Sequence, residues 1–115
     1  MIAVIFEVEI ADGQKEGYLD IAGDLKPLLE EVDGFISVER FQSLTTPGKL
    51  LSLSYFEDED SLAAWRNRPH HRSAQSAGRN THFADYRLRI ASVMRDYGLN
   101  ERDEAPDDAR AALEG

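Results

Sequence analysis

Hydrophobic residues alternate with small or acidic ones in the first ten residues of the chain, MIAVIFEVEI. A period of two is typical of a strand with one buried face, so the pattern predicts a strand over Ile2–Ile10. Apolar positions then recur at helical spacing over Tyr18–Val32, which predicts an amphipathic helix. We expect Asp12 to cap this helix, and Pro27 to kink it or restart it near Asp24.

Two further strand-like runs follow, Phe35–Gln42 and Leu50–Phe56, and the loop sequence TTPG lies between them. Their composition and the short loop predict a hairpin. Because side chains alternate along a strand, we expect one face of the first run to combine four residues, Phe35, Ser37, Glu39 and Phe41.

The acidic run EDED at 57–60 predicts the start of a second helix, because acids in a first turn meet the positive end of the helix dipole. Leu62 and Trp65 fall on its buried side. Pro69 suits the first turn of a further short helix, and Gly78 suits the residue after its end. The second helical region is therefore expected to be broken in two, with the second piece at about Pro69–Ala77.

A fourth strand is predicted over Phe83–Met94. Its alternation places Tyr86, Leu88 and Ile90 on one face, and Arg87, Arg89 and Ala91 on the other.

The resulting order, β-α-β-β-α-β, predicts an α+β fold of the ferredoxin-like kind, with an antiparallel sheet and helices on one face. The other face needs a cover. Its candidate residues, Ala3, Ile5, Phe35 and Phe41, are apolar enough to predict a partner subunit.

We interpret residues 1–98 as one domain and residues 99–115 as an acidic, mobile C-terminal tail. The tail contains Pro106 and few large apolar residues. Its stretch Ala109–Leu113 predicts no more than a weak helical turn.

The net charge of −9 argues against nucleic acid as a partner. The charge is uneven, since residues 62–99 are net positive and all their basic residues other than histidine are arginine. These arginines either bind an anionic ligand or pair with acids elsewhere in the fold, and we favour the second interpretation.

The chain has no cysteine, which excludes disulfides and thiolate chemistry. No apolar run approaches the roughly 20 residues of a membrane span, and the acidic N-terminal run does not resemble a signal peptide. We therefore expect a cytoplasmic protein without membrane contact. The spacing of its three histidines matches no metal motif, so we expect no metal.

The most informative stretch for function is WRNRPHHRSAQSAGR at 65–79, which holds the single tryptophan and two of the three histidines. On the predicted helix His71 and Gln75 are four residues apart and share a face, so with Trp65 they would form the wall of a pocket. A structural role is the alternative for each of them. A tryptophan on the apolar side of a helix is usually a core residue, and His82 would be a surface or strand-end residue.

The run SLSYFEDEDSLAAWRNRPHHRSAQSAGR, followed by FADYRLRIASVMRDYG and preceded by GFISVERFQS, resembles small single-domain proteins of the antibiotic biosynthesis monooxygenase family. The resemblance covers about residues 1–98 and indicates no particular substrate. It implies a ferredoxin-like monomer that pairs sheet to sheet as a homodimer, a dimeric α+β barrel. Members include cofactor-free quinol or anthrone monooxygenases and haem-degrading monooxygenases.

For the cofactor-free members, the resemblance implies oxidation of a small electron-rich aromatic by dioxygen without any cofactor. An electron-rich anion can pass one electron to triplet dioxygen, so the protein must bind the aromatic, remove a proton and exclude water. By position in the motif His71 is the candidate base, with His70 second. Trp65 would be a pocket wall, and Gln75 or an arginine, Arg79, would hold the oxyanion.

Two alternatives stay open. Haem-degrading members use an asparagine on the first strand and a longer gap between tryptophan and histidine, whereas this first strand offers only Glu7 and Glu9 as polar residues. Both differences count against haem. A non-catalytic dimer that binds a small ligand is the other alternative, because one pocket can serve binding or turnover.

Overall fold

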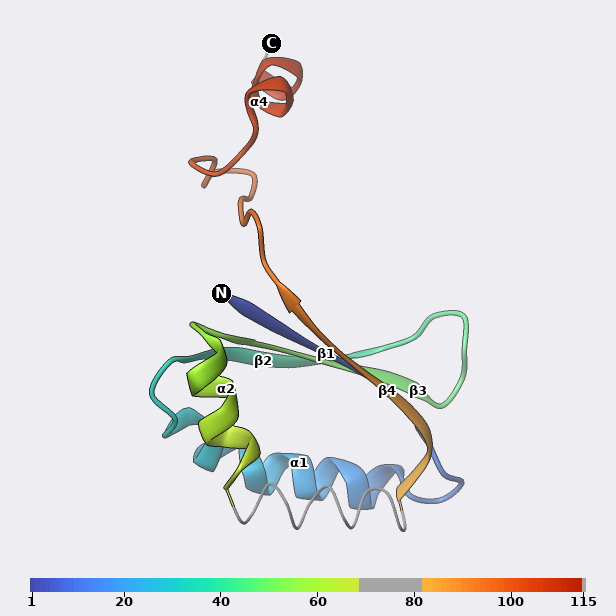
Figure 1. Cartoon of the computed structure of the whole chain (residues 1–115). Coiled ribbons are helices and arrows are strands. Elements are labelled where there is room, and N and C mark those ends of the chain that lie inside the picture. Colours follow the sequence, from blue (N-terminus) through green and yellow to red (C-terminus); the bar gives the residue numbers. More distant parts are fainter. Residues whose placement is uncertain (69–81, 115) are drawn as a thin grey trace.

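The computed structural model describes residues 1–68 and 82–114 of the chain. A four-stranded antiparallel sheet forms its body, with strands in the order β2-β3-β1-β4. The strands are β1 (Ile2–Ile10), β2 (Phe35–Gln42), β3 (Lys49–Phe56) and β4 (Phe83–Ser92), and the helices are α1 (Lys15–Glu30), α2 (Glu59–Arg66) and α4 (Asp107–Glu114). Helices α1 and α2 lie on one face of the sheet (Figure 1). The predicted ferredoxin-like α+β fold is confirmed.

The even-numbered residues of β1 point toward the helices, as the alternation predicted. Val8 is fully buried and packs with Tyr18 of α1 and Leu50 of β3. A second cluster surrounds Phe56, which is 1% exposed. Its buried members are Leu29, Val32, Phe56, Leu62 and Trp65. The predicted burial of the apolar side of α2 is therefore confirmed.

The prediction that Phe35 lies on the helix-free face is wrong. The pairing of β2 with β3 shifts between Phe35 and Ser37, which is a β-bulge. An extra residue on one strand moves everything before it to the opposite face. Phe35 therefore packs edge-on against Phe56, with the ring centroids 5.7 Å apart, whereas Phe41 keeps its place on the open face.

Helix α1 differs from its prediction in its N-cap residue and in the restart expected near Asp24. Asp12 does not cap it, because Asp12 belongs to the preceding turn and the N-cap position is Gln14, which makes no side-chain cap bond. The helix does not restart near Asp24 but continues through Pro27. Both Pro27 and Gly23, four residues earlier, are exposed, so the carbonyl that loses its partner remains open to water.

Helix α2 begins with a cap that the acidic run supplies. The carboxylate of Asp58 accepts a 2.8 Å hydrogen bond from the backbone N–H of Ser61 and a 2.7 Å bond from its hydroxyl. The backbone bond in particular holds the pKa of Asp58 below its usual range. The helix ends at Arg66, directly after Trp65.

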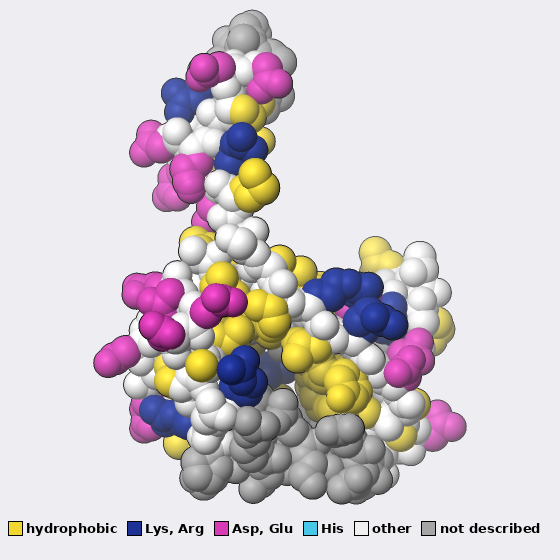
Figure 2. All heavy atoms as spheres, in the orientation of Figure 1, with side chains coloured by type: hydrophobic (Ala, Val, Ile, Leu, Met, Phe, Trp, Pro, Cys, Tyr) yellow, Lys and Arg dark blue, Asp and Glu magenta, His cyan; other side chains and the backbone are white. Residues whose placement is uncertain are grey.

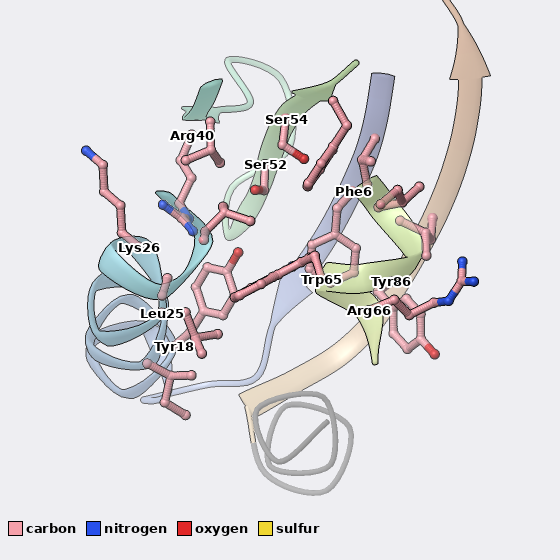
Figure 3. A pocket seen from close by; sticks show the side chains of 18 of the residues that line it. Phe6, Tyr18, Leu25, Lys26, Arg40, Ser52, Ser54, Trp65, Arg66 and Tyr86 are labelled. Carbon is pink, nitrogen blue, oxygen red and sulfur yellow. The ribbon is translucent and has the colours of Figure 1, made fainter. Parts of the chain in front are cut away.

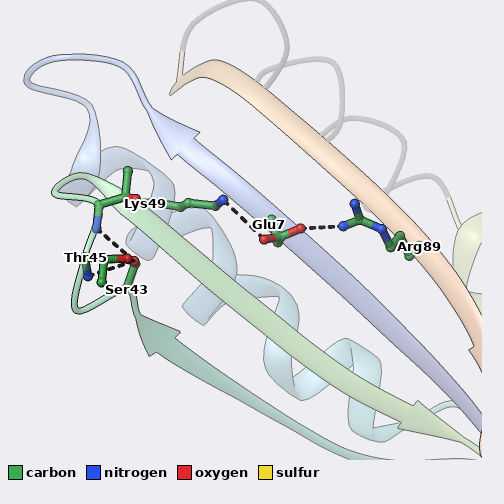
Figure 4. A network of polar contacts seen from close by, with 6 residues as sticks. Glu7, Ser43, Thr45, Lys49 and Arg89 are labelled. Carbon is green, nitrogen blue, oxygen red and sulfur yellow. Dashed lines mark hydrogen bonds and ion pairs between the residues drawn. The ribbon is translucent and has the colours of Figure 1, made fainter.

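The open face of the sheet carries a charged group at its centre. The carboxylate of Glu7 accepts from Arg89 of β4 and pairs with Lys49 of β3 at 3.2 Å (Figure 4). These contacts, the Arg89 hydrogen bond first, hold the pKa of Glu7 below its usual range. Apolar residues surround this group on the same face, namely Ala3, Ile5, Phe41, Leu51, Leu53 and Tyr55.

Beyond β4, which stops short of the predicted Met94, the chain runs away from the sheet and ends in α4 (Figure 1). The weak turn predicted at Ala109–Leu113 is part of this helix. The segment makes its own hydrogen bonds, since the guanidinium of Arg110 donates to the carbonyls of Ala105 and Asp103 at 3.1 and 2.8 Å.

We expect removal of residues 100–115 to leave the sheet and its two covering helices folded, because both core clusters lie within residues 2–83. The thermal midpoint of the truncated chain should stay within about 5 °C of the parent, which for a domain of this size is on the order of 1 kcal/mol. A larger drop, measured by circular dichroism at equal protein concentration, would show that the tail packs on the domain.

Candidate functional site

A cavity of about 420 Å³ lies between the helix-side face of the sheet and helices α1 and α2. Figure 2 shows hydrophobic side chains gathered around a hollow in this part of the molecule, with basic side chains beside it. Tyr18 and Leu25 border the cavity from α1, Trp65 from α2 and Phe6 from the sheet (Figure 3). Its wall is therefore mainly apolar and aromatic, as ligand pockets usually are.

Strand β3 explains why a space remains there. Its helix-side residues are Leu50, Ser52, Ser54 and Phe56. The two large residues belong to the two core clusters, whereas the serines between them line the cavity. Because a serine fills much less volume than leucine or phenylalanine, the sheet and helices cannot close over the middle of this strand.

The edge strand β4 forms the second wall. Tyr86, Leu88 and Ile90 face the same side as Phe6, and all three line the cavity, as the predicted alternation implied. They are nonetheless 41, 48 and 45% exposed. Large apolar side chains that stay this open provide contact area for a ligand.

Charged groups at the cavity are all basic among the described residues. Lys26, Arg40 and Arg66 belong to its lining, which contains no aspartate or glutamate. The Nε atom of Arg40 is buried and has no hydrogen-bond partner among the described residues. The electrostatic environment therefore favours a negative group on a ligand.

His82, directly before β4, is the one described histidine, and it also lines the cavity. Its Nδ1 lies 3.0 Å from Oε1 of Gln14. An amide oxygen only accepts, so Nδ1 is the donor of this hydrogen bond, and in a neutral imidazole Nε2 is then the nitrogen that can accept a proton. The ring also packs closely on α1, since a Cβ added at Gly17 would lie 2.7 Å from Cε1 of His82. The ring of His82 is thus held between Gln14 and Gly17.

The sequence model of antibiotic biosynthesis monooxygenases matches residues 1–77, which contribute strands β1 to β3 and both helices around the cavity. The chain belongs to the antibiotic biosynthesis monooxygenase family. The resemblance inferred from the residues is thereby confirmed.

Related proteins support the same assignment. The jasmonate monooxygenase of Pyricularia oryzae is 45% identical over 101 residues, which are 88% of this chain and 47% of that protein. The chain thus spans about half the length of this relative. An uncharacterized Bacillus subtilis protein, YqjZ, is 29% identical over 81% of this chain and 79% of its own.

Solved structures confirm the fold of the family. A Deinococcus radiodurans protein classed with the antibiotic biosynthesis monooxygenases superposes with a TM-score of 0.76 at 11% identity, covering 86% of this chain and 98% of its own. A Nitrosomonas europaea protein of the same class reaches 0.72 at 13% identity, covering 82% and 99%. At such low identities the likeness shows the fold alone.

Of the site residues predicted within this family framework, the structure places Trp65. Its side chain is 7% exposed and belongs both to the core cluster and to the cavity wall, so it is a core residue, and its part in binding a substrate stays a prediction. The other predicted site residues, His70, His71, Gln75 and Arg79, lie outside the described residues, as does the predicted helix Pro69–Ala77.

Sequence reasoning assigned only Trp65 of the described lining to a pocket, and among the residues it missed are Tyr18, Arg40, His82 and Tyr86. Tyr18 and Tyr86 follow the apolar periodicity, and they were interpreted as packing positions only. The predicted alternation places Arg40 on the face opposite Phe41, as the structure has it, but nothing in the sequence connected this arginine with a pocket. His82 lies at the strand end, which was one of its two predicted positions, but no periodicity assigns its ring a direction there. The ring is half-buried because it packs on Gln14 and Gly17, which are far from it in sequence.

Within residues 1–68 and 82–114, no three histidine, aspartate or glutamate side chains come together as metal ligands. In the same part of the chain, no helix is long and apolar enough to cross a membrane.

Proposed function

We propose that the protein is a monooxygenase that transfers one oxygen atom of dioxygen to a small, largely apolar molecule held in the helix-side cavity. The observation that carries the proposal is this apolar cavity, with one fixed imidazole in its wall, in a chain of the antibiotic biosynthesis monooxygenase family. The 45% identity to a protein named as a monooxygenase supports the reaction type.

The first substrate class is a small electron-rich aromatic, such as a quinol or an anthrone, oxidised without an added cofactor. For an activated methylene the balance is R₂CH₂ + O₂ → R₂C=O + H₂O, so the substrate itself supplies every electron. The protein then has to bind the ring, accept a proton, stabilise the anion and exclude water. The aromatic walls, including Tyr18, Trp65 and Tyr86, suit the flat ring.

The proton acceptor is proposed to be a histidine. The family motif favours His71, with His70 second and Gln75 or Arg79 holding the oxyanion. The cavity supports His82 as the competing candidate, since its Nε2 is left free by the bond from Nδ1 to Gln14. Imidazole is the side chain whose ordinary pKa lies nearest to neutral pH, which is why a histidine is proposed for the proton step.

The second substrate class is jasmonate itself, which the name of the Pyricularia oryzae relative favours. Hydroxylation of an unactivated C–H bond follows R–H + O₂ + 2e⁻ + 2H⁺ → R–OH + H₂O. This reaction needs an external reductant, whereas the first needs none. The requirement for a reductant therefore separates the two classes.

The test measures oxygen uptake and product mass with a panel of quinols and anthrones, and with jasmonate in the presence and absence of NADH. A chelator in every assay excludes trace metal, and parallel reactions without protein give the autoxidation rate. We expect at least one substrate to be oxidised faster than it autoxidises and to gain one oxygen atom from ¹⁸O₂. If none does, the protein is a ligand-binding member of the family.

We expect ferric haem to bind weakly or not at all. The cavity-facing residues of β1 are Val4 and Phe6, whereas Glu7 and Glu9 lie on the opposite face of the sheet, so the first strand offers the cavity no polar side chain. Titration should give no sharp Soret band at a 1:1 ratio. A stoichiometric band that disappears in His71→Ala would contradict this and favour haem chemistry.

We further propose that the protein is a homodimer closed by the open face of the sheet. The apolar residues around Glu7 support this, because no described helix covers them. Phe41, which is 42% exposed, lies on this face.

We expect Phe41→Asp to split the dimer, since a carboxylate there would be buried without a partner. Light scattering at micromolar concentration should show a dimer for the parent and a monomer for this variant. Leu44→Asp is the matched control, because Leu44 is fully exposed in the β2–β3 loop. A parent protein that is monomeric under these conditions would refute the proposed dimer.

A further inference from the structure

Arg40 occupies an unusual position for a charged residue. It lies on β2 opposite Ser52, on the side of the sheet that faces the helices, and it lines the cavity. Figure 3 shows its side chain extending from the strand toward α1. The residue is half-buried, its Nε is buried, and no described residue accepts a hydrogen bond from that atom.

Two other arginines of the fold have carboxylate partners. Arg68 pairs with Glu31 at 3.3 Å, and Arg89 pairs with Glu7 on the open face. For these two, the expectation that the arginines form structural ion pairs is confirmed. Arg40 differs, because the described lining of its cavity has no acid.

The stretch between α2 and β4 that lies outside the described residues has no acidic side chain to offer either. Residues 69–81 contain no aspartate or glutamate and add two more arginines. Within the cavity, Lys26 and Arg66 add positive charge. A guanidinium in a mainly apolar cavity, without a counter-ion from the described chain, attracts an anion strongly, because the low dielectric strengthens the interaction and the fork of donors matches two oxygens of an acid.

We propose that the cavity selects small amphipathic organic anions, and that Arg40 binds their acidic group while the ring or chain packs on the apolar wall. The acid is a carboxylate or an equivalent oxyanion next to a hydrophobic body that fits about 420 Å³. The inference deepens the proposed function, since it names the charge of the substrate and rests on that proposal for the oxidation only. It applies to jasmonate, which is a carboxylate, and to aromatic acids.

The test compares two fluorescent probes that differ by one acidic group, the anion 8-anilinonaphthalene-1-sulfonate and neutral N-phenyl-1-naphthylamine. Binding is measured by titration under argon, so no turnover takes place. Arg40→Met removes the charge at nearly constant length, and Arg40→Lys keeps the charge without the fork. Arg95→Met is the matched control, because Arg95 is exposed beyond β4 and outside the cavity lining.

We expect Arg40→Met to weaken binding of the sulfonate at least about 10-fold, as the loss of a charge-assisted hydrogen bond does, and to change binding of the neutral probe less than about 3-fold. The sulfonate affinity of Arg40→Lys should lie between those of the parent and Arg40→Met, and that of Arg95→Met should match the parent. Unchanged sulfonate binding in Arg40→Met, or an equal loss in Arg95→Met, overturns the proposal. Failure of both probes to bind the parent overturns it too.

A second measurement needs no variant and covers the case in which Arg40→Met does not fold. Jasmonate should displace N-phenyl-1-naphthylamine from the parent at a concentration at least about 10-fold lower than its methyl ester. Equal displacement overturns the proposal. Because these experiments measure binding alone, a lost charge preference leaves the oxygenase proposal standing, and absent oxygen uptake leaves the anion proposal standing.

Discussion

Alanine in place of Phe56 is expected to lower the free energy of unfolding by about 3–5 kcal/mol, the usual range for a large aromatic removed from a core. Phe56 is 1% exposed and packs with Leu29, Leu62 and Trp65, which join β3 to both covering helices. Its neighbours already border the cavity, so they are not pressed into the space that the removed ring would leave. A large part of the about 5–15 kcal/mol by which such domains are usually stable would therefore be lost.

The measurement is urea unfolding at one fixed protein concentration, because association would make the midpoint depend on concentration. Leu44→Ala is the control and should stay within about 0.5 kcal/mol of the parent, since that side chain is fully exposed. A loss below about 1 kcal/mol for Phe56→Ala would mean that the two helices do not depend on this strand end.

The second large effect concerns proton transfer. Losing a general base costs about 10²–10⁴-fold in rate, so His71→Ala should slow turnover at least about 100-fold while the fold survives. His70→Ala should do much less, because neighbours on the helix predicted there point about 100° apart. The measurement is the steady-state rate of oxygen uptake with the best substrate, with circular dichroism to check folding.

His82→Ala decides between the two candidates. A larger loss than in His71→Ala would transfer the role to His82. Gly17→Ala is a second test of His82, because the added Cβ would displace the imidazole without removing it, and the rate of oxygen uptake is measured again. If all the histidine variants match the parent, no histidine takes the proton and the catalytic proposal should be abandoned for ligand binding.

The strands and their pairing could be predicted because each run alternates cleanly and its ends carry turn residues. β1 and β2 have the predicted bounds. What alternation cannot supply is a change of register within a strand. The bulge after Phe35 moved that residue into the core, whereas the residues after it, Arg40 included, keep the predicted alternation.

The cavity itself was less predictable than the fold. Trp65 carries a local signal, since it is large, unique and on an apolar helix face. His82 acquires its role only through Gln14 and Gly17, which lie far from it in sequence. Contacts of that kind depend on how the completed layers meet, and no short window of sequence contains them.

Strand β3 gives different tasks to its ends and its middle. The large residues at its ends, Leu50 and Phe56, belong to the two core clusters, whereas Ser52 and Ser54 leave the space of the cavity. Substitution of these two serines can therefore change the volume of the cavity while both core clusters stay intact. Larger apolar side chains there would gain dispersion contacts and fill the space that a ligand would occupy. Two positions on one strand can therefore change, during evolution, the size of the ligand that fits the cavity.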